Sequence, residues 1–234
     1  MSDIRERLAR VRDRIANAAR RARRDPASVR LVAVSKTFPI QDIRAAFEAG
    51  QRDFGENKVQ EALQKIDAAR DLDAAWHLVG HLQSNKARKA GASFAFIHSI
   101  DGVDLVKRLD EAAASAGRRP ELLVQVDLAG ETTKHGARPD ELAGIFEAAR
   151  QLKAARLIGL MLLPPATEDP EGARQYFTAL HRLRDDLAAR GIDQTMLREL
   201  SMGMSHDFEV AVEEGATIVR VGSAIFGERH YAQP

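Results

Sequence analysis

The sequence predicts an α/β protein folded as a single (β/α)₈ barrel of the TIM type, with an extra helix at its N-terminus. From residue 30 onward, strand-like runs alternate with helical stretches in eight units, which favours a closed barrel over an open doubly wound sheet. No GxGxxG or Walker A motif follows the first strand, so a nucleotide-binding sheet is disfavoured. The strands are expected at 31–35, 52–55, 75–79, 95–99, 122–127, 157–161, 198–202 and 217–221.

Between these strands the apolar residues recur at helical spacing. Acidic residues or proline mark the expected helix starts at Asp42, Asp104, Pro139-Asp140 and Asp169-Pro170. Glycine marks the expected ends at Gly50, Gly117, Gly191 and Gly215. The helices are predicted near 40–50, 56–70, 84–91, 103–116, 139–152, 170–190 and 204–214.

The first helix is predicted over residues 2–24, because Ile4, Leu8, Val11 and Ile15 fall on one face. It ends in the basic run Arg20–Arg24. This run is either a basic patch or a solvated helix C-terminus, and we favour the second because cations suit that end of the helix dipole.

Composition limits the possible classes of protein. The 234 residues contain 44% apolar residues, which suits one large domain over 1–234, with the barrel itself over 30–230. A balance of 35 basic against 34 acidic residues gives no bulk argument for nucleic acid or anionic lipid. Cysteine is absent, and no leader or long apolar run is visible. We therefore expect a cytoplasmic protein with no nucleic-acid or membrane partner.

Basic residues and small-residue turns fall together at the predicted carboxyl ends of the strands. Lys36 ends the first strand, and Gly222-Ser223 follows the eighth, which closes against the first. Ser201–Ser205 follows the seventh strand. Arg220 lies within an apolar strand, where a guanidinium is costly to desolvate unless something pairs with it. These features predict a pocket for an anionic, electrophilic ligand such as an aldehyde phosphate.

Several motifs together resemble the pyridoxal phosphate homeostasis protein family, over about residues 4 to 231. The motifs are Val34-Ser-Lys36, Phe54-Gly-Glu-Asn57, Trp76–Lys86, Gly159-Leu-Met161, Leu200–Ser205 and Val219-Arg-Val-Gly-Ser223. The resemblance implies a barrel like the N-terminal domain of alanine racemase, holding pyridoxal 5'-phosphate (PLP) as a Schiff base. It implies that Lys36 bonds to PLP and that Arg220 meets the pyridine nitrogen. It also implies phosphate contacts from Ser201, Ser205, Gly222 and Ser223, and a ring pocket lined by Asn57 and Met161.

His77 and His81 are four residues apart, a spacing that binds metal on a helix. The segment reads as a strand, however, and four residues of strand span roughly 13 Å, too far for one ion. We therefore predict no metal site. Lys86 is better explained as a helix-start and rim residue, with a second anion or PLP site as the alternative.

Three functions are compatible with these features. A PLP-binding protein of PLP homeostasis would buffer the cofactor or deliver it to apo PLP-dependent enzymes, and we expect it to be a monomer without dedicated turnover. A PLP-dependent amino-acid racemase would need a second base. In alanine racemases that base is a tyrosine from a further domain, whereas the tyrosines here are Tyr176 on a helix and Tyr231 in the tail after the barrel. A binding module without a cofactor would leave Arg220 and the phosphate-like turns unexplained. We favour the homeostasis protein.

Overall fold

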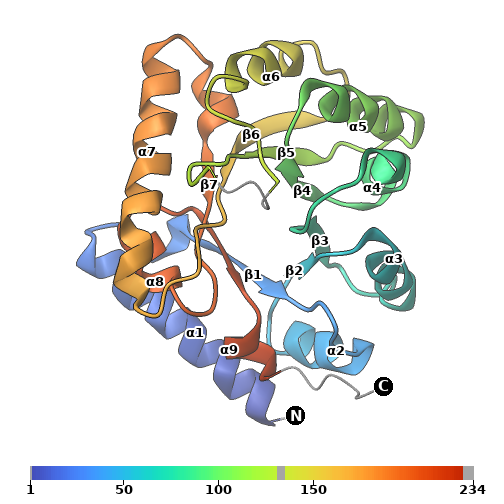
Figure 1. Cartoon of the computed structure of the whole chain (residues 1–234). Coiled ribbons are helices and arrows are strands. Elements are labelled where there is room, and N and C mark those ends of the chain that lie inside the picture. Colours follow the sequence, from blue (N-terminus) through green and yellow to red (C-terminus); the bar gives the residue numbers. More distant parts are fainter. Residues whose placement is uncertain (1, 131–134, 229–234) are drawn as a thin grey trace.

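Eight parallel strands close into a barrel in the order β1 to β8 (Figure 1). The structure is a computed structural model that describes residues 2–130 and 135–228. Each strand lies within two residues of its predicted bounds, so the predicted fold class is confirmed. The strands are β1 (Arg30–Val34), β2 (Asp53–Glu56), β3 (Ala75–Leu78), β4 (Phe96–Ile100), β5 (Glu121–Gln125), β6 (Arg156–Met161), β7 (Glu199–Ser201) and β8 (Ile218–Val221).

The helices form a ring outside the barrel (Figure 1). They are α1 (Ser2–Arg21), α2 (Ile40–Glu48), α3 (Val59–Ala68), α4 (Ala87–Ser93), α5 (Val103–Ser115), α6 (Leu142–Ala149), α7 (Arg174–Ala189), α8 (Phe208–Glu213) and α9 (Ser223–Phe226). Short 3₁₀ turns lie at η1 (Pro26–Ser28), η2 (Ser84–Lys86), η3 (Pro170–Ala173) and η4 (Gln194–Leu197). The sequence did not predict α9, η1 or η4, which are each four residues or fewer and too short to show periodicity.

The predicted helix ends are more accurate than the predicted starts. All four end glycines have positive φ, the left-handed conformation that glycine adopts without steric cost. By contrast, Asp42 and Asp104 lie inside the first turn, and the caps are Pro39 and Gly102. Asp169 caps η3 by accepting the amide of Glu171, so the helix predicted at 170 begins as a 3₁₀ turn.

Helix α1 covers the barrel beside α8 and α9, and its apolar face joins the main hydrophobic core. The basic run at its end is more firmly held than the expected solvated terminus. Arg21 pairs with Glu213 at 2.8 Å. Arg24 donates hydrogen bonds to the carbonyls of Val212 and Ala216. These contacts hold the end of α1 against α8. Because α1 also shares the main hydrophobic core with the barrel, the structure supports our proposal of a single domain.

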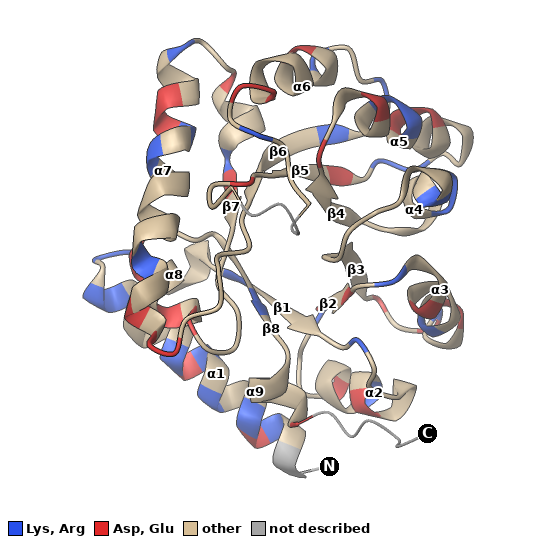
Figure 2. Cartoon of the chain, in the orientation of Figure 1, with Lys and Arg blue, Asp and Glu red and all other residues tan. Residues whose placement is uncertain are grey.

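Charged side chains are intermixed on the outer helices in the view of Figure 2, where basic and acidic residues alternate along α1, α5 and α7. The net charge of +1 is small because basic and acidic residues balance, and both kinds are spread over these helices. Within the described residues, no helix has the length and apolar character needed to cross a membrane.

Candidate functional site

The predicted pocket residues meet where β8 closes against β1. Val32 pairs with Arg220, and Ala33 pairs with Val221, so the turns that follow both strands lie at the same rim. A Cβ atom on Gly222 would lie 3.2 Å from the carbonyl oxygen of Val34, which shows how closely the two turns approach. Lys36, half-buried, follows β1 by two residues. The structure therefore brings Lys36, Arg220 and Gly222 together, as the order of the strands predicted.

Arg220 points into the barrel and is only 3% exposed. Its guanidinium donates to Ser201 Oγ at 2.6 Å and to the carbonyl oxygen of Leu162 at 2.8 Å. Burial lowers the pKa of Arg220 to about 10, and the charge of Asp207 opposes that shift. Among the described residues no carboxylate lies within ion-pair distance of it. Arg220 is therefore a buried cation, charged at neutral pH, whose direct partners are all neutral.

Ser201 lies beneath Arg220 and is fully buried. Besides accepting from Arg220, its hydroxyl is 2.8 Å from Nδ1 of His98. Both contacts turn Ser201 toward the barrel interior. The structure thus places the Ser201 hydroxyl with Arg220 and His98, and the phosphate contact that the resemblance implies for Ser201 stays a prediction.

Ser205 lies with the turn after β8. Its Oγ accepts the backbone amide of Gly222 at 3.0 Å and that of Ala224 at 3.4 Å. Ser223, between them, is exposed. These amides point at an oxygen, and the Ser205 hydroxyl occupies the kind of position that a phosphate oxygen takes in such a turn.

The turn that carries Lys36 is held by a charged cluster. Thr37 has a φ of 69°, uncommon for a β-branched residue, and its amide donates to Glu61 Oε1 at 2.7 Å. Ser35 donates to Glu56 Oε1 at 2.6 Å. Lys65 binds both carboxylates, at 2.9 Å for Glu56 and 2.7 Å for Glu61, and also donates to the carbonyl of Ser35. The residues on both sides of Lys36 are therefore fixed in place.

Asn57 and Met161 differ in exposure. Asn57 is half-buried after β2, and a Cβ on Gly80 would lie 2.4 Å from its carbonyl oxygen, so only glycine allows this approach. Met161 ends β6 and is fully buried in an apolar cluster inside the barrel. The cluster consists of Val32, Phe96, Leu123, Ile158, Met161 and Ile218. Met161 therefore packs as a core residue below the rim.

His77 and His81 have different partners. His77 lies inside the barrel, whereas His81 lies at the rim near Asp101 and His135. The ring centroids of His81 and His135 are 3.5 Å apart, and the ring planes differ by 10°. An imidazole binds zinc in its own plane at about 2.0–2.1 Å, so two stacked parallel rings do not converge on one ion. Potential ligand atoms of this trio lie within 4.8 Å of one another, but the ring orientation does not match a metal site.

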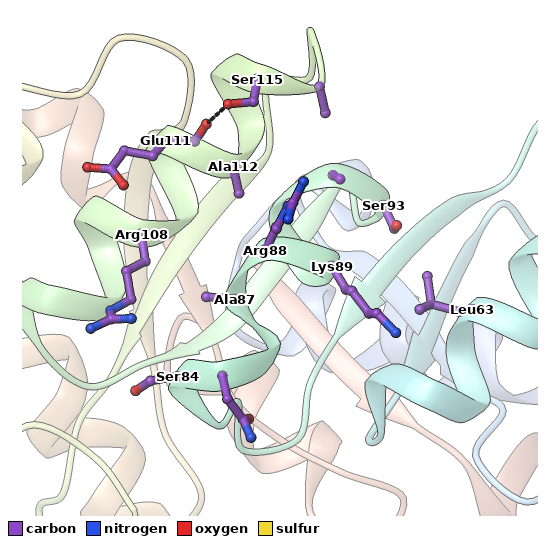
Figure 3. Close-up of a pocket in the computed structure, with 13 residues that line it drawn as sticks. Leu63, Ser84, Ala87, Arg88, Lys89, Ser93, Arg108, Glu111, Ala112 and Ser115 are labelled. Atoms are coloured by element: carbon purple, nitrogen blue, oxygen red, sulfur yellow. Dashed lines mark hydrogen bonds between the residues drawn. The ribbon is translucent and has the colours of Figure 1, made fainter.

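A groove of about 840 Å³ lies outside the barrel, between α4 and α5. Figure 3 shows Arg88, Lys89 and Arg108 along it. None of the predicted PLP-site residues lines this groove. Lys86 is half-buried in η2 beside it and does not line it either.

Sequence reasoning missed several residues that support the site. They are Asp53, Glu56, Lys65 and His98. Asp53 and His98 are polar residues inside strands, the same signal that marks Arg220. Lys65 lies on a helix predicted only as amphipathic, where no local pattern indicates that it reaches a strand end.

Comparison with known proteins defines the class first. The chain matches the family described as "Alanine racemase, N-terminal domain" over residues 7–230. An alanine racemase of Clostridium difficile shares the fold, with a TM-score of 0.73 and 14% identity, but this chain covers only 58% of it.

The full-length relatives narrow the assignment. A pyridoxal phosphate homeostasis protein of Aquifex aeolicus is 44% identical, and the match covers 97% of this chain and 98% of that protein. One of Pseudomonas aeruginosa is also 44% identical, over 100% of this chain and 99% of the other. PipY of Synechococcus elongatus, whose structure was solved with PLP bound, has a TM-score of 0.85 and 43% identity, covering 96% of this chain and 100% of PipY. The chain belongs to the pyridoxal phosphate homeostasis protein family.

Proposed function

We propose that this protein binds PLP for intracellular PLP homeostasis, with Lys36 as the residue that bonds covalently to the aldehyde. The observation that carries the proposal is Arg220, a buried cation with only neutral direct partners, at the same rim as Lys36. Burying a charge in this way is costly, and an electron-rich ring nitrogen would offset part of the cost. The family assignment and the PLP-bound relative support the same conclusion.

The residues at the rim fit the remaining groups of PLP. The amides of Gly222 and Ala224, with the hydroxyls of Ser205 and Ser223, would hold the phosphate. Asn57 would contact the ring from the end of β2, and Met161 would support the ring pocket from below. Ser201 belongs to the same site because it orients Arg220. PLP supplies an aldehyde that reversibly bonds to amines, which is the chemistry that a carrier needs.

We further propose that the protein has no dedicated turnover and passes PLP to apo PLP-dependent enzymes. An arginine at the ring nitrogen keeps that nitrogen unprotonated, so the ring is a poor electron sink. Tyr176 lies on the outer helix α7, packed against the core, and Tyr231 lies outside the described residues.

Borohydride reduction tests the covalent assignment. The protein is incubated with PLP, reduced and digested, and the modified lysine is identified by mass spectrometry. We expect the adduct on Lys36, its loss in Lys36→Ala, and its retention in the control Lys58→Ala, which changes an exposed lysine nearby. An adduct confined to another lysine, with Lys36 unmodified, would contradict the proposal. Conversion of L-alanine to D-alanine that depends on Lys36 would favour a racemase instead.

A further inference from the structure

A continuous chain of hydrogen bonds crosses the barrel interior below Arg220. Ser201 Oγ joins Arg220 to His98 Nδ1, at 2.6 Å and 2.8 Å. His98 Nε2 is 2.9 Å from His77 Nδ1, and His77 Nε2 is 3.0 Å from Asp53 Oδ1. Asp53 begins β2 and Arg220 lies near the end of β8, so the chain runs between opposite ends of the barrel. The five side chains come from five different strands.

The two ends of this chain differ in chemistry. Arg220 can only donate, because a guanidinium has no acceptor. Asp53 can only accept while it is ionised. Burial by itself raises the pKa of Asp53, but the hydrogen bond from His77 and the nearby charge of Arg30 outweigh it and lower that pKa. Arg30 also pairs with Asp53 at 3.1 Å. A donor therefore stands at one end and an acceptor at the other.

The middle of the chain is neutral. His77 and His98 are both fully buried. Burial lowers the pKa of His77, with the hydrogen bond of Asp53 opposing it. Burial lowers the pKa of His98 further, and the charge of Arg220 acts in the same direction. A neutral imidazole has one donor and one acceptor nitrogen, so each histidine passes one hydrogen bond on.

We propose that the proton order along this chain is fixed and that it positions Arg220. Ser201 donates to His98 Nδ1, His98 donates from Nε2 to His77 Nδ1, and His77 donates from Nε2 to Asp53. With neutral rings, the reverse order would point a ring lone pair at the Asp53 carboxylate. Asp53, His77 and His98 are thus positioning residues, which touch no ligand but hold Ser201 as an acceptor for Arg220.

The orientation of Arg220 has a consequence at the rim. A guanidinium has five N–H groups, and the contacts with Ser201 and Leu162 fix the plane in which the others lie. A chain of hydrogen bonds also polarises each member toward the carboxylate at its end. The chain therefore stabilises the charged form of a guanidinium that has no carboxylate of its own. The expected effect on PLP binding rests on the proposed function, whereas the proton order is a property of the protein alone.

The histidine tautomers test the proton order directly and without PLP. In protein labelled with ¹⁵N at histidine, long-range proton–nitrogen NMR spectra at neutral pH distinguish Nε2–H, Nδ1–H and cationic rings. His77→Gln and His98→Gln assign the two signals. We expect both rings as neutral Nε2–H tautomers. An Nδ1–H tautomer in either ring, or a cationic His77, would overturn the proposed order.

Asp53→Asn tests the positioning role, with Asp73→Asn as the control. Asp73 is exposed and lies on the same side, just before β3. An amide can donate to His77 as well as accept, so Asp53→Asn replaces the acceptor-only group that fixes the order with one that permits either order. We expect the Kd for PLP to rise by roughly tenfold and the His98 tautomer to become mixed, with neither change in the control.

The readouts separate this inference from the proposed function. If PLP failed to modify Lys36 while both tautomers were as expected, the proposed function would fail and the proton order would stand. If Asp53→Asn left both the Kd and the His98 tautomer unchanged, the positioning role would be wrong even though PLP is bound at Lys36.

Discussion

Lys36 and Arg220 lie at the same rim, but the protein holds them by opposite means. The turn around Lys36 is fixed by a charged cluster, in which Lys65 binds Glu56 and Glu61 at 2.9 Å and 2.7 Å. Arg220 is fixed by a neutral serine and a backbone carbonyl. The carboxylate of its hydrogen-bond chain, Asp53, is separated from it by three residues.

Because of this difference, removing Lys65 and removing Arg220 leave different groups without a partner. Without Lys65, the fully buried Glu56 would keep a carboxylate with no opposite charge beside it. Without Arg220, only a hydroxyl and a carbonyl would lose a donor. Stranding a buried charge costs more than stranding a neutral group. The charged cluster therefore stabilises the fold, and the neutral chain leaves the Arg220 charge available for a ligand.

The largest effect is expected from Lys65→Met. This change removes three hydrogen bonds and leaves Glu56 unpaired, so the free energy of unfolding should fall by about 3–5 kcal/mol. Urea denaturation followed by circular dichroism measures it. The matched variant Lys65→Met with Glu56→Gln removes both charges and should recover much of the loss. Equal losses in the single and double variants would show that Glu56 is not the stranded group.

Arg220→Met should have a smaller effect on stability but a clear effect on the ligand. The substitution leaves only neutral groups without a hydrogen-bond donor and removes a buried charge, so the free energy of unfolding should change by less than about 2 kcal/mol. The Kd for PLP, measured by titration of the absorbance of bound PLP, should rise by tenfold or more. A loss of stability as large as that of Lys65→Met would contradict the contrast between the two regions.

Between pH 7.5 and 5.5, acid should weaken the inner chain and not the charged cluster. In that cluster the pKa of Glu61 is lowered, against the effect of burial, by hydrogen bonds from Lys65 and Thr37, so its contribution is lost only as pH falls below 4.5. The pKa of both His77 and His98 is lowered by burial from the usual 6.5, so below that pH the unfolded state takes up protons that the folded state does not. Stability therefore falls as pH falls below 6.5, by at most about 1.4 kcal/mol per pH unit for each ring. Burial raises the pKa of Glu56, with Ser35 and Lys65 opposing, so its contribution is lost instead as pH rises above 4.5.

Thermal unfolding between pH 7.5 and 5.5 checks the acid effect. The Tm of the wild type should fall across this range, and that of His98→Gln should fall less. His206→Gln, which changes an exposed histidine on another loop, should behave like the wild type. A flat wild-type profile would mean that the buried rings do take up protons in the folded state.

The sequence predicted the barrel and the rim well, because both depend on local patterns. The strands are short runs that alternate with helical stretches, and the strand order alone places the turns that carry Lys36 and Gly222 at the same rim. The interior chain was not predicted, because His77, His98 and Asp53 are distant in sequence and only the closed barrel brings them into line. For Ser201 the motif indicated a site residue, but which way its hydroxyl points depends on side-chain packing within the barrel.

The smallest effect is expected from metal ions. His81, Asp101 and His135 are close enough to suggest a metal site, yet the stacked rings present their nitrogens side by side instead of toward a common point. Adding EDTA or one equivalent of Zn²⁺ should therefore leave the PLP titration unchanged, and calorimetry should detect no tight Zn²⁺ binding. Stoichiometric binding that is lost in His135→Ala, but kept in His206→Ala, would show that the rings rotate to bind the ion and would refute the prediction of a metal-free rim.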